Sequence, residues 1–363
     1  MQRFYVDWVD RLSKLAEVKD GFHTKEVKTS VSAYPVNFSE VREVLKFCCD
    51  FSLKLYPMGF GTHPIGPSVK ADVALVLSRL NRIKEVTSVY ASVEAGCAFS
   101  ELKRELEKRS LFIPFDYTGS AGGLASTNSV SVFSTWYGFP RENLLGAKLC
   151  TGDGVVLNSG SKTTKFSSGY KVWKSLAGSL GWLGVYLELY YRVYPLPECF
   201  LSAEADVSLF EKLLYGETRP GALWVEFSDS HEKLFAIFFG FTSALERLKL
   251  NAKLSSGLTQ PSELEGNVVS LFSVRGKELE TTRRALKLLK GVRAIVYAGC
   301  GLSRIEVKDF SGIDEVRRFA TLVVEKGEYQ GDYWGFRSPT LSKLKRALDP
   351  CFALSPGKFE QVY

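Results

Sequence analysis

A short glycine-rich stretch, Met58-Gly59-Phe60-Gly61-Thr62-His63, has the residue types and spacing to bind a phosphate-bearing ligand. Glycines at positions 59 and 61 let the main chain turn sharply and direct consecutive N–H groups into a concavity. Such a concavity suits a pyrophosphate, and the Thr62 hydroxyl adds one donor. An ordinary glycine-rich turn is the alternative interpretation.

The residue order of this stretch excludes two familiar phosphate-binding motifs. No Gly-Lys-Ser/Thr follows it, and its glycine spacing is not Gly-x-Gly-x-x-Gly. A second set of glycines, hydroxyls and one amide comes later, at Gly119, Ser120, Gly122, Gly123, Ser126 and Asn128. We predict that the second set provides further donors and allows close approach of the main chain to a ligand, although a helix-capping turn would have the same composition.

Side chains that bind metals or act as bases are scarce. The sequence has three histidines, which are His23, His63 and His231, and seven cysteines without a Cys-x-x-Cys. The odd number and the spacing of the cysteines predict no disulfide framework and no zinc or iron–sulfur site. Buried free thiols in a reducing compartment are the simplest interpretation.

The composition is that of a globular protein. The 363 residues are 45% hydrophobic and 24% charged, and the net charge of +7 is spread along the chain without a basic block, which argues against nucleic-acid binding. No segment has the apolar length of a transmembrane helix, and Asp7 and Asp10 interrupt any signal-peptide core. We therefore expect a cytoplasmic protein that could reach a membrane only through a partner.

The elements that must position the glycine stretches can be predicted from periodicity. A helix is expected over 38–51, with Asn37 or Ser39 as N-cap, followed by a strand at Leu53 and Leu55. Ser100 is expected to cap a second helix that runs through Arg109. A hairpin over 147–157 and a strand with one buried face over 185–193 follow.

Prolines at 195 and 197 mark a domain boundary. Beyond it, strands are expected at Leu223–Phe227, Leu234–Phe241, Val268–Val274 and Ala294–Tyr297. They alternate with helical stretches near 242–253, 278–290 and 312–326, a pattern that predicts a second layered domain.

Taken in order, the motifs of the first 195 residues resemble the FAD-binding domain of the vanillyl-alcohol oxidase / p-cresol methylhydroxylase superfamily. Within this superfamily, the motif sequences are most similar to those of the FAD-binding subunit of glycolate oxidase and of its D-lactate dehydrogenase relatives. The motifs that carry the resemblance are the first glycine stretch, Val73–Ile83, Val93–Gly96, Gly119–Asn128, Tyr137–Gly138, Thr151–Gly154 and Gly178–Val185.

The resemblance implies an α+β fold, with a two-subdomain PCMH-type FAD-binding domain at 1–196 and a smaller α/β cap (substrate) domain at 197–330. The cap would lie over the flavin. A C-terminal segment at 331–363 would return to the FAD domain, because Leu348–Lys358 resembles the family's Asp-Pro…Asn-Pro-Gly-Lys ending.

The FAD-binding residues implied are Met58, Gly59, Phe60, Gly61, Thr62, His63, Gly119, Ser120, Gly122, Gly123, Ser126, Asn128 and Val185. Relatives that attach FAD covalently carry a histidine at the position of Thr62. Since His63 is displaced by one residue, the resemblance implies noncovalent FAD.

The implied activity is FAD-dependent oxidation of a small 2-hydroxy acid such as glycolate or D-lactate, in a complex with a larger flavin subunit and an iron–sulfur subunit. A flavin-binding structural or electron-transfer subunit and a stand-alone alditol or sugar oxidase are the alternatives. Larger relatives carry His-x-Gly-Asp-Gly-Asn-x-His where this chain has Tyr297–Leu302, so no metal site is expected and the catalytic base is unknown. Candidates for a carboxylate clamp are Arg275, Arg304 and Arg337, and candidates for the flavin face are Tyr297, Tyr333 and Trp334.

Overall fold

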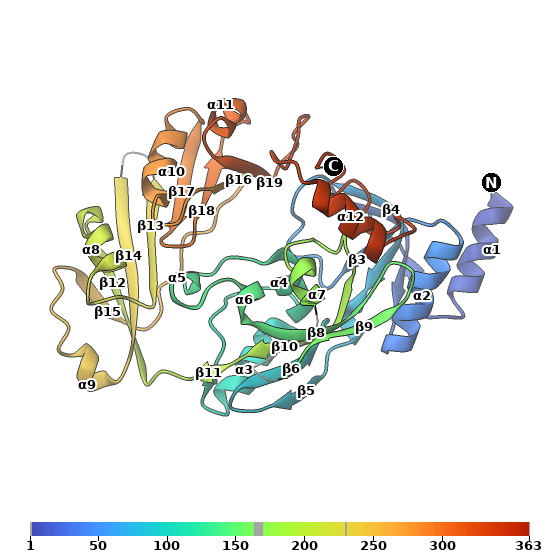
Figure 1. The fold of residues 1–363 in the computed structure, drawn as a ribbon, viewed down its shortest axis with the longest axis horizontal. Helices are drawn as coiled ribbons and strands as arrows, with labels where there is room; N and C mark the ends of the chain where they lie inside the picture. The colour runs from blue at the N-terminus through green and yellow to red at the C-terminus, as the bar shows by residue number, and fades with distance from the viewer. Residues whose placement is uncertain (1, 163–169, 229–230, 363) are drawn as a thin grey trace. The chain divides into compact units, whose positions relative to one another are not determined.

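The computed structural model describes residues 2–162, 170–228 and 231–362, and the chain divides into two compact units (Figure 1). Unit 1 comprises Met1–Ser129, Pro140–Pro195 and Arg337–Tyr363, and unit 2 comprises Val130–Phe139 and Leu196–Phe336. The sequence places boundaries at 196 and 330, whereas these units break after Pro195 and after Phe336. Residues 130–139, which the sequence assigns to the first domain, pack in unit 2, where Thr135 Oγ1 donates to Ala298 O at 2.9 Å.

Unit 1 contains two main sheets. The first has the order β1-β2-β4-β3, and the second has the order β5-β6-β10-β8-β9. The first sheet consists of β1 (Glu17–Asp20), β2 (Val27–Tyr34), β3 (Leu55–Met58) and β4 (Val69–Val76), and the second of β5 (Ile83–Val86), β6 (Tyr90–Glu94), β8 (Leu144–Cys150), β9 (Val156–Gly160) and β10 (Val185–Arg192), while β7 (Leu111–Phe112) pairs with β11 (Tyr194–Pro195). The helices are α1 (Gln2–Leu12), α2 (Phe38–Asp50), η1 (Leu77–Arg79), α3 (Phe99–Glu107), α4 (Ala121–Thr127), α6 (Pro140–Asn143), α7 (Val172–Leu176) and α12 (Pro339–Leu348).

Helix α2 confirms the prediction made from its periodicity. Asn37 is the N-cap, and its side chain accepts a hydrogen bond from Glu40 N. Val41 and Leu45 point into the core and are fully buried. The helix ends at Asp50, and β3 follows, so that the first glycine stretch begins at the end of a strand that lies parallel to β4.

The predicted start of the second helix is wrong. Helix α3 begins at Phe99, and its N-cap Ala98 makes no side-chain hydrogen bond, so Ser100 is not the cap. Phe99 is fully buried and its N–H donates to Gly119 O at 2.9 Å. Burial of this ring draws the chain into the helix before Ser100.

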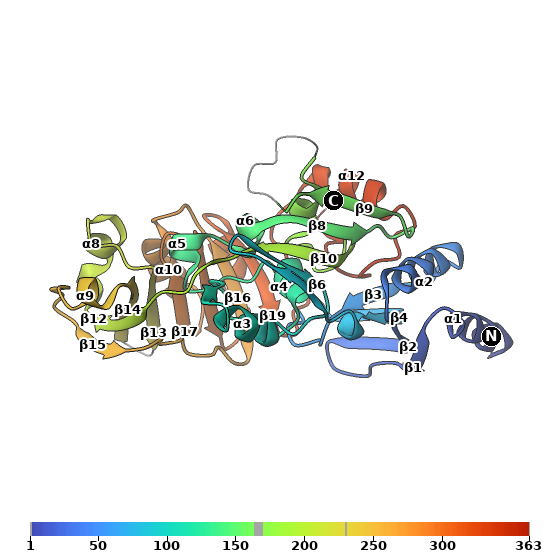
Figure 2. The same ribbon diagram turned by 90° about the horizontal axis from the view of Figure 1, so that it is seen from below.

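Strand β10 forms where alternation predicts it, but the expectation of one buried face is wrong. The strand lies in the centre of its sheet, between β6 and β8, with α4 beside it (Figure 2). On the face opposite the apolar side chains, Tyr186 and Glu188 are buried as well. The predicted hairpin is confirmed as β8 and β9, which pair antiparallel.

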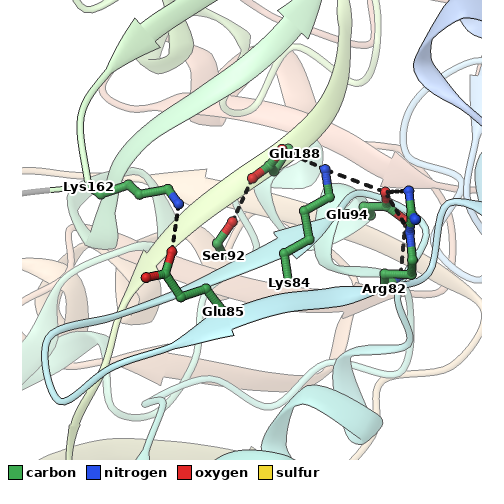
Figure 3. Close-up of polar contacts among 7 residues, drawn as sticks. All are labelled: Arg82, Lys84, Glu85, Ser92, Glu94, Lys162 and Glu188. Atoms are coloured by element: carbon green, nitrogen blue, oxygen red, sulfur yellow. Dashed lines mark hydrogen bonds and ion pairs between the residues drawn. The ribbon is translucent and has the colours of Figure 1, made fainter.

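The buried acids on this sheet are neutralised by a local network (Figure 3). Glu188 accepts from Ser92 Oγ at 2.6 Å and from Lys84 Nζ at 2.9 Å. Arg82 Nη2 donates to Glu94 Oε1 at 2.9 Å. Burial acts to raise the pKa of Glu188, but the bonds from Ser92 and Lys84 outweigh it, and the pKa is lowered. The carboxylate therefore stays charged inside the sheet layer.

Unit 2 is built on one eight-stranded sheet with the order β15-β12-β14-β13-β17-β18-β16-β19, and every pairing is antiparallel. Its strands are β12 (Cys199–Ala205), β13 (Ala222–Ser228), β14 (His231–Gly240), β15 (Lys253–Ser256), β16 (Asn267–Phe272), β17 (Gly291–Tyr297), β18 (Leu302–Val307) and β19 (Thr321–Lys326). Its helices are α5 (Ser134–Tyr137), η2 (Val207–Leu209), α8 (Phe210–Tyr215), α9 (Thr242–Leu245), α10 (Glu278–Leu286) and α11 (Ile313–Arg317).

The four strands predicted for the second half are confirmed as β13, β14, β16 and β17. Two of the helical stretches are shorter than expected. The stretch near 242–253 forms only α9 before the chain enters β15, and the stretch near 312–326 forms only α11 before β19. Leu322 and Val324 of β19 are fully buried in the core under α11, so burial against the sheet overrides the helical pattern.

The C-terminal segment returns to unit 1, as the resemblance implied (Figure 1). After α12, Leu354 forms a parallel bridge with Leu55 of β3. Lys345 Nζ anchors the segment through Trp182 O at 2.7 Å and Leu354 O at 2.9 Å. Among the described residues, no helix has both the length and the apolar character needed to cross a membrane.

The expectation that all cysteines are free is wrong for one pair. Cys49 in the last turn of α2 and Cys351 in the C-terminal segment form a disulfide, with a Cα–Cα distance of 5.4 Å. The partners are 302 residues apart in sequence, so their spacing carried no sign of the pairing. The other five cysteines are free.

Candidate functional site

One cavity in unit 1 gathers most of the residues predicted to bind the cofactor. It encloses about 800 Å³ between its walls, part of it open to solvent. The predicted residues that line it are Met58, Gly59, Phe60, Gly61, Thr62, His63, Ser120, Gly122, Gly123, Ser126 and Val185. Two glycine stretches and one strand that are distant in sequence therefore meet around a single space.

Two predicted residues do not line the cavity. Gly119 O accepts the hydrogen bond from Phe99 N, and Gly119 lies against Tyr117, so it fixes the start of α3 and of α4. Asn128 ends α4 in the left-handed conformation, with φ at 49°, and its side chain accepts from Arg141 N at 2.9 Å. Both residues therefore contact the segments next to the cavity and not the cavity itself.

The first glycine stretch turns as its composition predicts. Gly61 has a φ of 70°, in the left-handed region that glycine adopts without a steric penalty. A Cβ on Gly59 would lie 2.2 Å from Ser120 Oγ, so the two glycine stretches touch only because residue 59 lacks a side chain. Within the described part of the chain, the main-chain N–H groups of Gly59, Phe60, Gly61 and Thr62 donate to no other residue. These donors are available to an anion in the cavity.

In the second glycine stretch, two of the main-chain N–H groups donate within the protein. Gly122 N donates to Ala95 O at 2.7 Å, and Gly123 N donates to Ser120 Oγ at 3.1 Å. A Cβ on Gly122 would lie 2.8 Å from Ala95 Cβ, so this glycine lets α4 pack closely against the end of β6. The stretch therefore supplies a thin wall and hydroxyl groups, while its main-chain donors at 122 and 123 are already used.

His63 is held at the edge of the first stretch. Its Nδ1 lies 2.8 Å from Thr62 Oγ1, and its ring stacks on Tyr117 with the centroids 4.4 Å apart. Burial raises the pKa of Tyr117 to about 12, so this phenol is neutral at physiological pH. The contacts fix the imidazole beside the cavity.

Lys358 is a functional candidate that sequence reasoning did not single out. It is 2% exposed, and its Nζ donates to Ile65 O and, at 2.6 Å, to Pro67 O, just beyond the first glycine stretch. Burial lowers the pKa of Lys358 to about 7. Among the described residues that line the cavity, it is the sole lysine or arginine. The signal was present in the C-terminal Pro356-Gly357-Lys358, but only the fold brings that tail to the cavity.

The residues proposed for substrate chemistry are not brought together. Arg275 lines a separate cavity in unit 2, Arg304 Nε binds Glu325 Oε2 at 2.8 Å, and Arg337 opens the C-terminal segment of unit 1. The three aromatic candidates are buried or partly buried in unit 2: Tyr297 is 5% exposed, Trp334 is 4% exposed, and Tyr333 Oη donates to Gly327 O at 3.0 Å.

The turn between β17 and β18 contains no base. Cys300 is 6% exposed there, and burial raises its pKa to about 12. Among the residues that the structure describes, no group of three or more histidine, cysteine, aspartate or glutamate side chains could hold a metal ion.

Comparison with known proteins gives the same cofactor that the motifs imply. Residues 29–160 match a family described as FAD binding domain. This range holds the first glycine stretch and the second, including every predicted cofactor residue except Val185.

Similar proteins are dehydrogenases and oxidase subunits. The chain is 25% identical over 346 residues to D-lactate dehydrogenase of Archaeoglobus fulgidus, a match that covers 84% of this chain and 74% of that one. It is 29% identical over 188 residues to the mitochondrial D-lactate dehydrogenase [cytochrome] of Arabidopsis thaliana, covering 50% of this chain and 33% of the relative. It is 28% identical over 172 residues to glycolate oxidase subunit GlcD of Bacillus subtilis, covering 45% of this chain and 37% of the relative. The matches to the last two thus span little more than a third of those relatives.

The fold is shared with solved flavoenzymes. Xylooligosaccharide oxidase from Myceliophthora thermophila C1 superposes with a TM-score of 0.70 at 12% identity, covering 97% of this chain and 98% of that one. At this identity the likeness concerns the fold alone. Residues 29–160 therefore form an FAD-binding domain, and the chain is similar to dehydrogenases and oxidase subunits and shares the fold of solved flavoenzymes.

Proposed function

We propose that the chain holds FAD noncovalently in the cavity of unit 1 and oxidises a small 2-hydroxy acid such as glycolate or D-lactate. The FAD proposal rests on the consecutive N–H groups of Gly59–Thr62, which donate to no other described residue and lie within the range 29–160 that matches the FAD binding domain. Bound FAD would accept a hydride from the substrate carbon, so the protein provides position and polarity.

The residues of the cavity fit such a group in three ways. The N–H groups of Gly59–Thr62 would bind the pyrophosphate, and Lys358 would offset its charge. Gly122 and Gly123 would let the cofactor approach α4, and Val185 would meet it through its main chain. His63 is engaged with Thr62 and Tyr117, which supports a noncovalent site.

The substrate and the assembly are proposed from the relatives. The names D-lactate dehydrogenase and glycolate oxidase subunit GlcD indicate a 2-hydroxy acid and a multi-subunit enzyme. We propose that electrons pass from the chain to a larger flavin subunit or an iron–sulfur subunit. In this arrangement, residues 1–196 form the FAD domain, residues 197–330 form the substrate-binding cap, and residues 331–363 complete the cofactor cavity through Lys358.

A second candidate is a flavin-binding or electron-transfer subunit without substrate chemistry. The turn at Tyr297–Leu302 favours it, because that turn offers only a buried thiol with a raised pKa where a base would be needed. A stand-alone alditol or sugar oxidase would need the same cofactor cavity with a different cap.

The cofactor is tested by acid precipitation of the purified protein. We expect yellow protein that releases intact FAD into the supernatant, because no covalent link is formed at Thr62 or His63. Flavin that remains on the polypeptide and is lost in His63→Ala would contradict noncovalent binding. Colourless protein that does not take up FAD would contradict the cofactor proposal itself.

The reaction is tested by anaerobic mixing, which isolates flavin reduction from any acceptor. We expect glycolate or D-lactate to bleach the flavin slowly, with an increase of about 10²–10⁴-fold when a larger partner subunit supplies the missing base. Rapid bleaching by the isolated chain would show that another residue acts as the base and would remove the need for that partner. No bleaching by hydroxy acids, alditols or sugars, with or without partners, would favour the structural role.

A further inference from the structure

A second cavity lies wholly within unit 2 and has a different character from the first. It encloses about 700 Å³, part of it open to solvent. Its walls come from α5, from the end of α8 and the loop after it, from Arg275–Gly276 in the connection between β16 and α10, and from Gly299 in the turn between β17 and β18. No aspartate or glutamate is among its described lining residues, whereas two arginines, Arg219 and Arg275, are.

The two arginines have no acidic partner in the described part of the chain. Arg219 is held by the main chain, since its Nε donates to Gly216 O at 3.2 Å. Arg275 forms neither a hydrogen bond nor an ion pair with another described residue. Neither guanidinium group forms an ion pair with a described residue; the nearby carboxylate of Glu278 is buried and accepts from Gly276 N at 2.9 Å and from Gly301 N at 2.6 Å instead. The guanidinium groups are therefore available to a ligand, and a carboxylate can satisfy one of them with two parallel hydrogen bonds.

Aromatic rings line the same cavity. Trp136 is 56% exposed and Tyr215 is 59% exposed, although both are large apolar side chains. Gly276 permits the approach of Tyr215, because a Cβ there would lie 2.0 Å from Tyr215 Oη. Thr135 fixes α5, and with it Trp136, through the bond to Ala298 O at 2.9 Å. Exposed aromatic rings beside arginines that form no ion pair can contact the aromatic ring of an anionic ligand.

We propose that this cavity is a binding site for the carboxylate of an aryl-bearing acid, with Arg275 and Arg219 holding the carboxylate and Trp136 and Tyr215 contacting the ring. If the protein oxidises a 2-hydroxy acid as proposed, the cavity indicates which kind: an aromatic 2-hydroxy acid would contact both the arginines and the rings. This part of the inference rests on the proposed function. Glycolate and D-lactate carry the same carboxylate but leave both rings without a contact.

The site can be followed without any turnover through Trp136. The other five tryptophans, Trp8, Trp173, Trp182, Trp224 and Trp334, are at most 5% exposed, so Trp136 dominates quenching by acrylamide, a neutral molecule. We expect D-mandelate to protect this fluorescence in a saturable manner, and Trp136→Phe to remove the signal. Three comparison ligands test one feature each: D-lactate lacks the aromatic ring, mandelamide lacks the negative charge, and inorganic phosphate is an anion without a carboxylate.

Arg275→Gln should weaken D-mandelate binding by about tenfold or more, because a charge-assisted pair is lost. The exposed Arg318, which does not line the cavity, provides the matched control Arg318→Gln, for which no change is expected. Absence of protection by D-mandelate, or equal weakening in both variants, overturns the proposal. Equal binding of D-lactate overturns the role of the rings, and equal binding of mandelamide or phosphate overturns the carboxylate site.

The failure of this inference differs from the failure of the proposed function. Flavin reduction by glycolate or D-lactate without D-mandelate binding would retain the function and refute the aryl site. Saturable, Arg275-dependent binding of D-mandelate in a protein whose flavin no hydroxy acid reduces would retain the site and refute the function.

Discussion

The cavity of unit 1 and the cavity of unit 2 both suit anions, but they are built from different parts of the chain. In unit 1 the available donors are main-chain N–H groups between Gly59 and Thr62, with one buried lysine behind them. In unit 2 they are the side chains of Arg219 and Arg275 beside two exposed rings. The first site depends on backbone conformation, so it should be sensitive to shape. The second depends on charge, so it should be sensitive to the loss of a single guanidinium group.

Gly61→Val tests the dependence on backbone conformation and has the largest expected effect. The φ of 70° is strained for a β-branched residue, and the new Cβ would lie 2.8 Å from Met58 Cε. We expect the variant to lose FAD entirely during gel filtration, while D-mandelate still protects Trp136 in unit 2.

The control is Gly257→Ala in unit 2, where φ is 95° and a Cβ would meet nothing within 4 Å. This variant also places a side chain at a positive φ, but in unit 2 and outside the cofactor stretch, and its FAD content should be unchanged. Retention of FAD by Gly61→Val would show that the cofactor does not depend on the turn at residue 61.

Cys351→Ser tests whether the C-terminal segment stabilises unit 1 alone. A cross-link between residues 302 positions apart removes many conformations from the unfolded chain, and such disulfides contribute about 2–4 kcal/mol to the free energy of unfolding. We expect a lower urea midpoint for unit 1 and weaker FAD retention, with no change in anion binding by unit 2.

Dithiothreitol provides an internal comparison for this prediction. It should lower the midpoint of the wild type to that of Cys351→Ser and leave the variant unchanged. Cys199→Ser removes a free cysteine of unit 2 and serves as the matched control. A wild-type midpoint that is the same with and without reductant would contradict a stabilising cross-link.

Lys358→Met tests the one lysine of the unit 1 cavity and has the smallest expected effect, about a tenfold loss of FAD affinity near pH 6. Burial lowers the pKa of Lys358 to about 7, and the protonated form attracts the pyrophosphate. Wild-type affinity should therefore fall as the pH rises above 7, whereas the affinity of Lys358→Met should stay level. Lys70→Met, on the exposed side of β4, should behave as the wild type.

The same lysine affects the stability of the FAD-free protein with a defined sign. Because its pKa is about 7 when folded and 10.5 in the absence of burial, unfolding takes up a proton between these values. The free energy of unfolding should thus rise with pH across that range, and Lys358→Met should reduce the slope. An identical slope in the variant would show that Lys358 is not buried in the manner described.

Several features of unit 1 could be predicted from neighbouring residues. Asn37 caps α2, the hairpin of β8 and β9 forms around its glycines, and Gly61 adopts a left-handed conformation. These outcomes depend on turn chemistry and periodicity within about ten residues. The start of α3 at Phe99 instead of Ser100 shows the limit, because burial of one ring changed the boundary.

Features that depend on distant partners were not predicted. Strand β19 occupies the second part of a stretch that was expected to be helical, because pairing with β16 provides burial and hydrogen bonds that a local pattern does not reveal. The main-chain N–H groups of Gly122 and Gly123 are used within the protein, because Ala95 O and Ser120 Oγ accept them.

The sequence by itself therefore predicted FAD, which the family match over residues 29–160 supports, and most of the residues that line the cavity of unit 1, because glycines in fixed order encode a backbone shape. The tertiary structure alone decided the Cys49–Cys351 disulfide, the position of Lys358 beside the glycine stretch, and the meeting of Arg219 with Arg275 in one cavity. Each of these joins side chains from separate segments. Such a contact depends on how the sheets and the C-terminal segment pack, and the spacing of two residues along the chain does not reveal their distance in space.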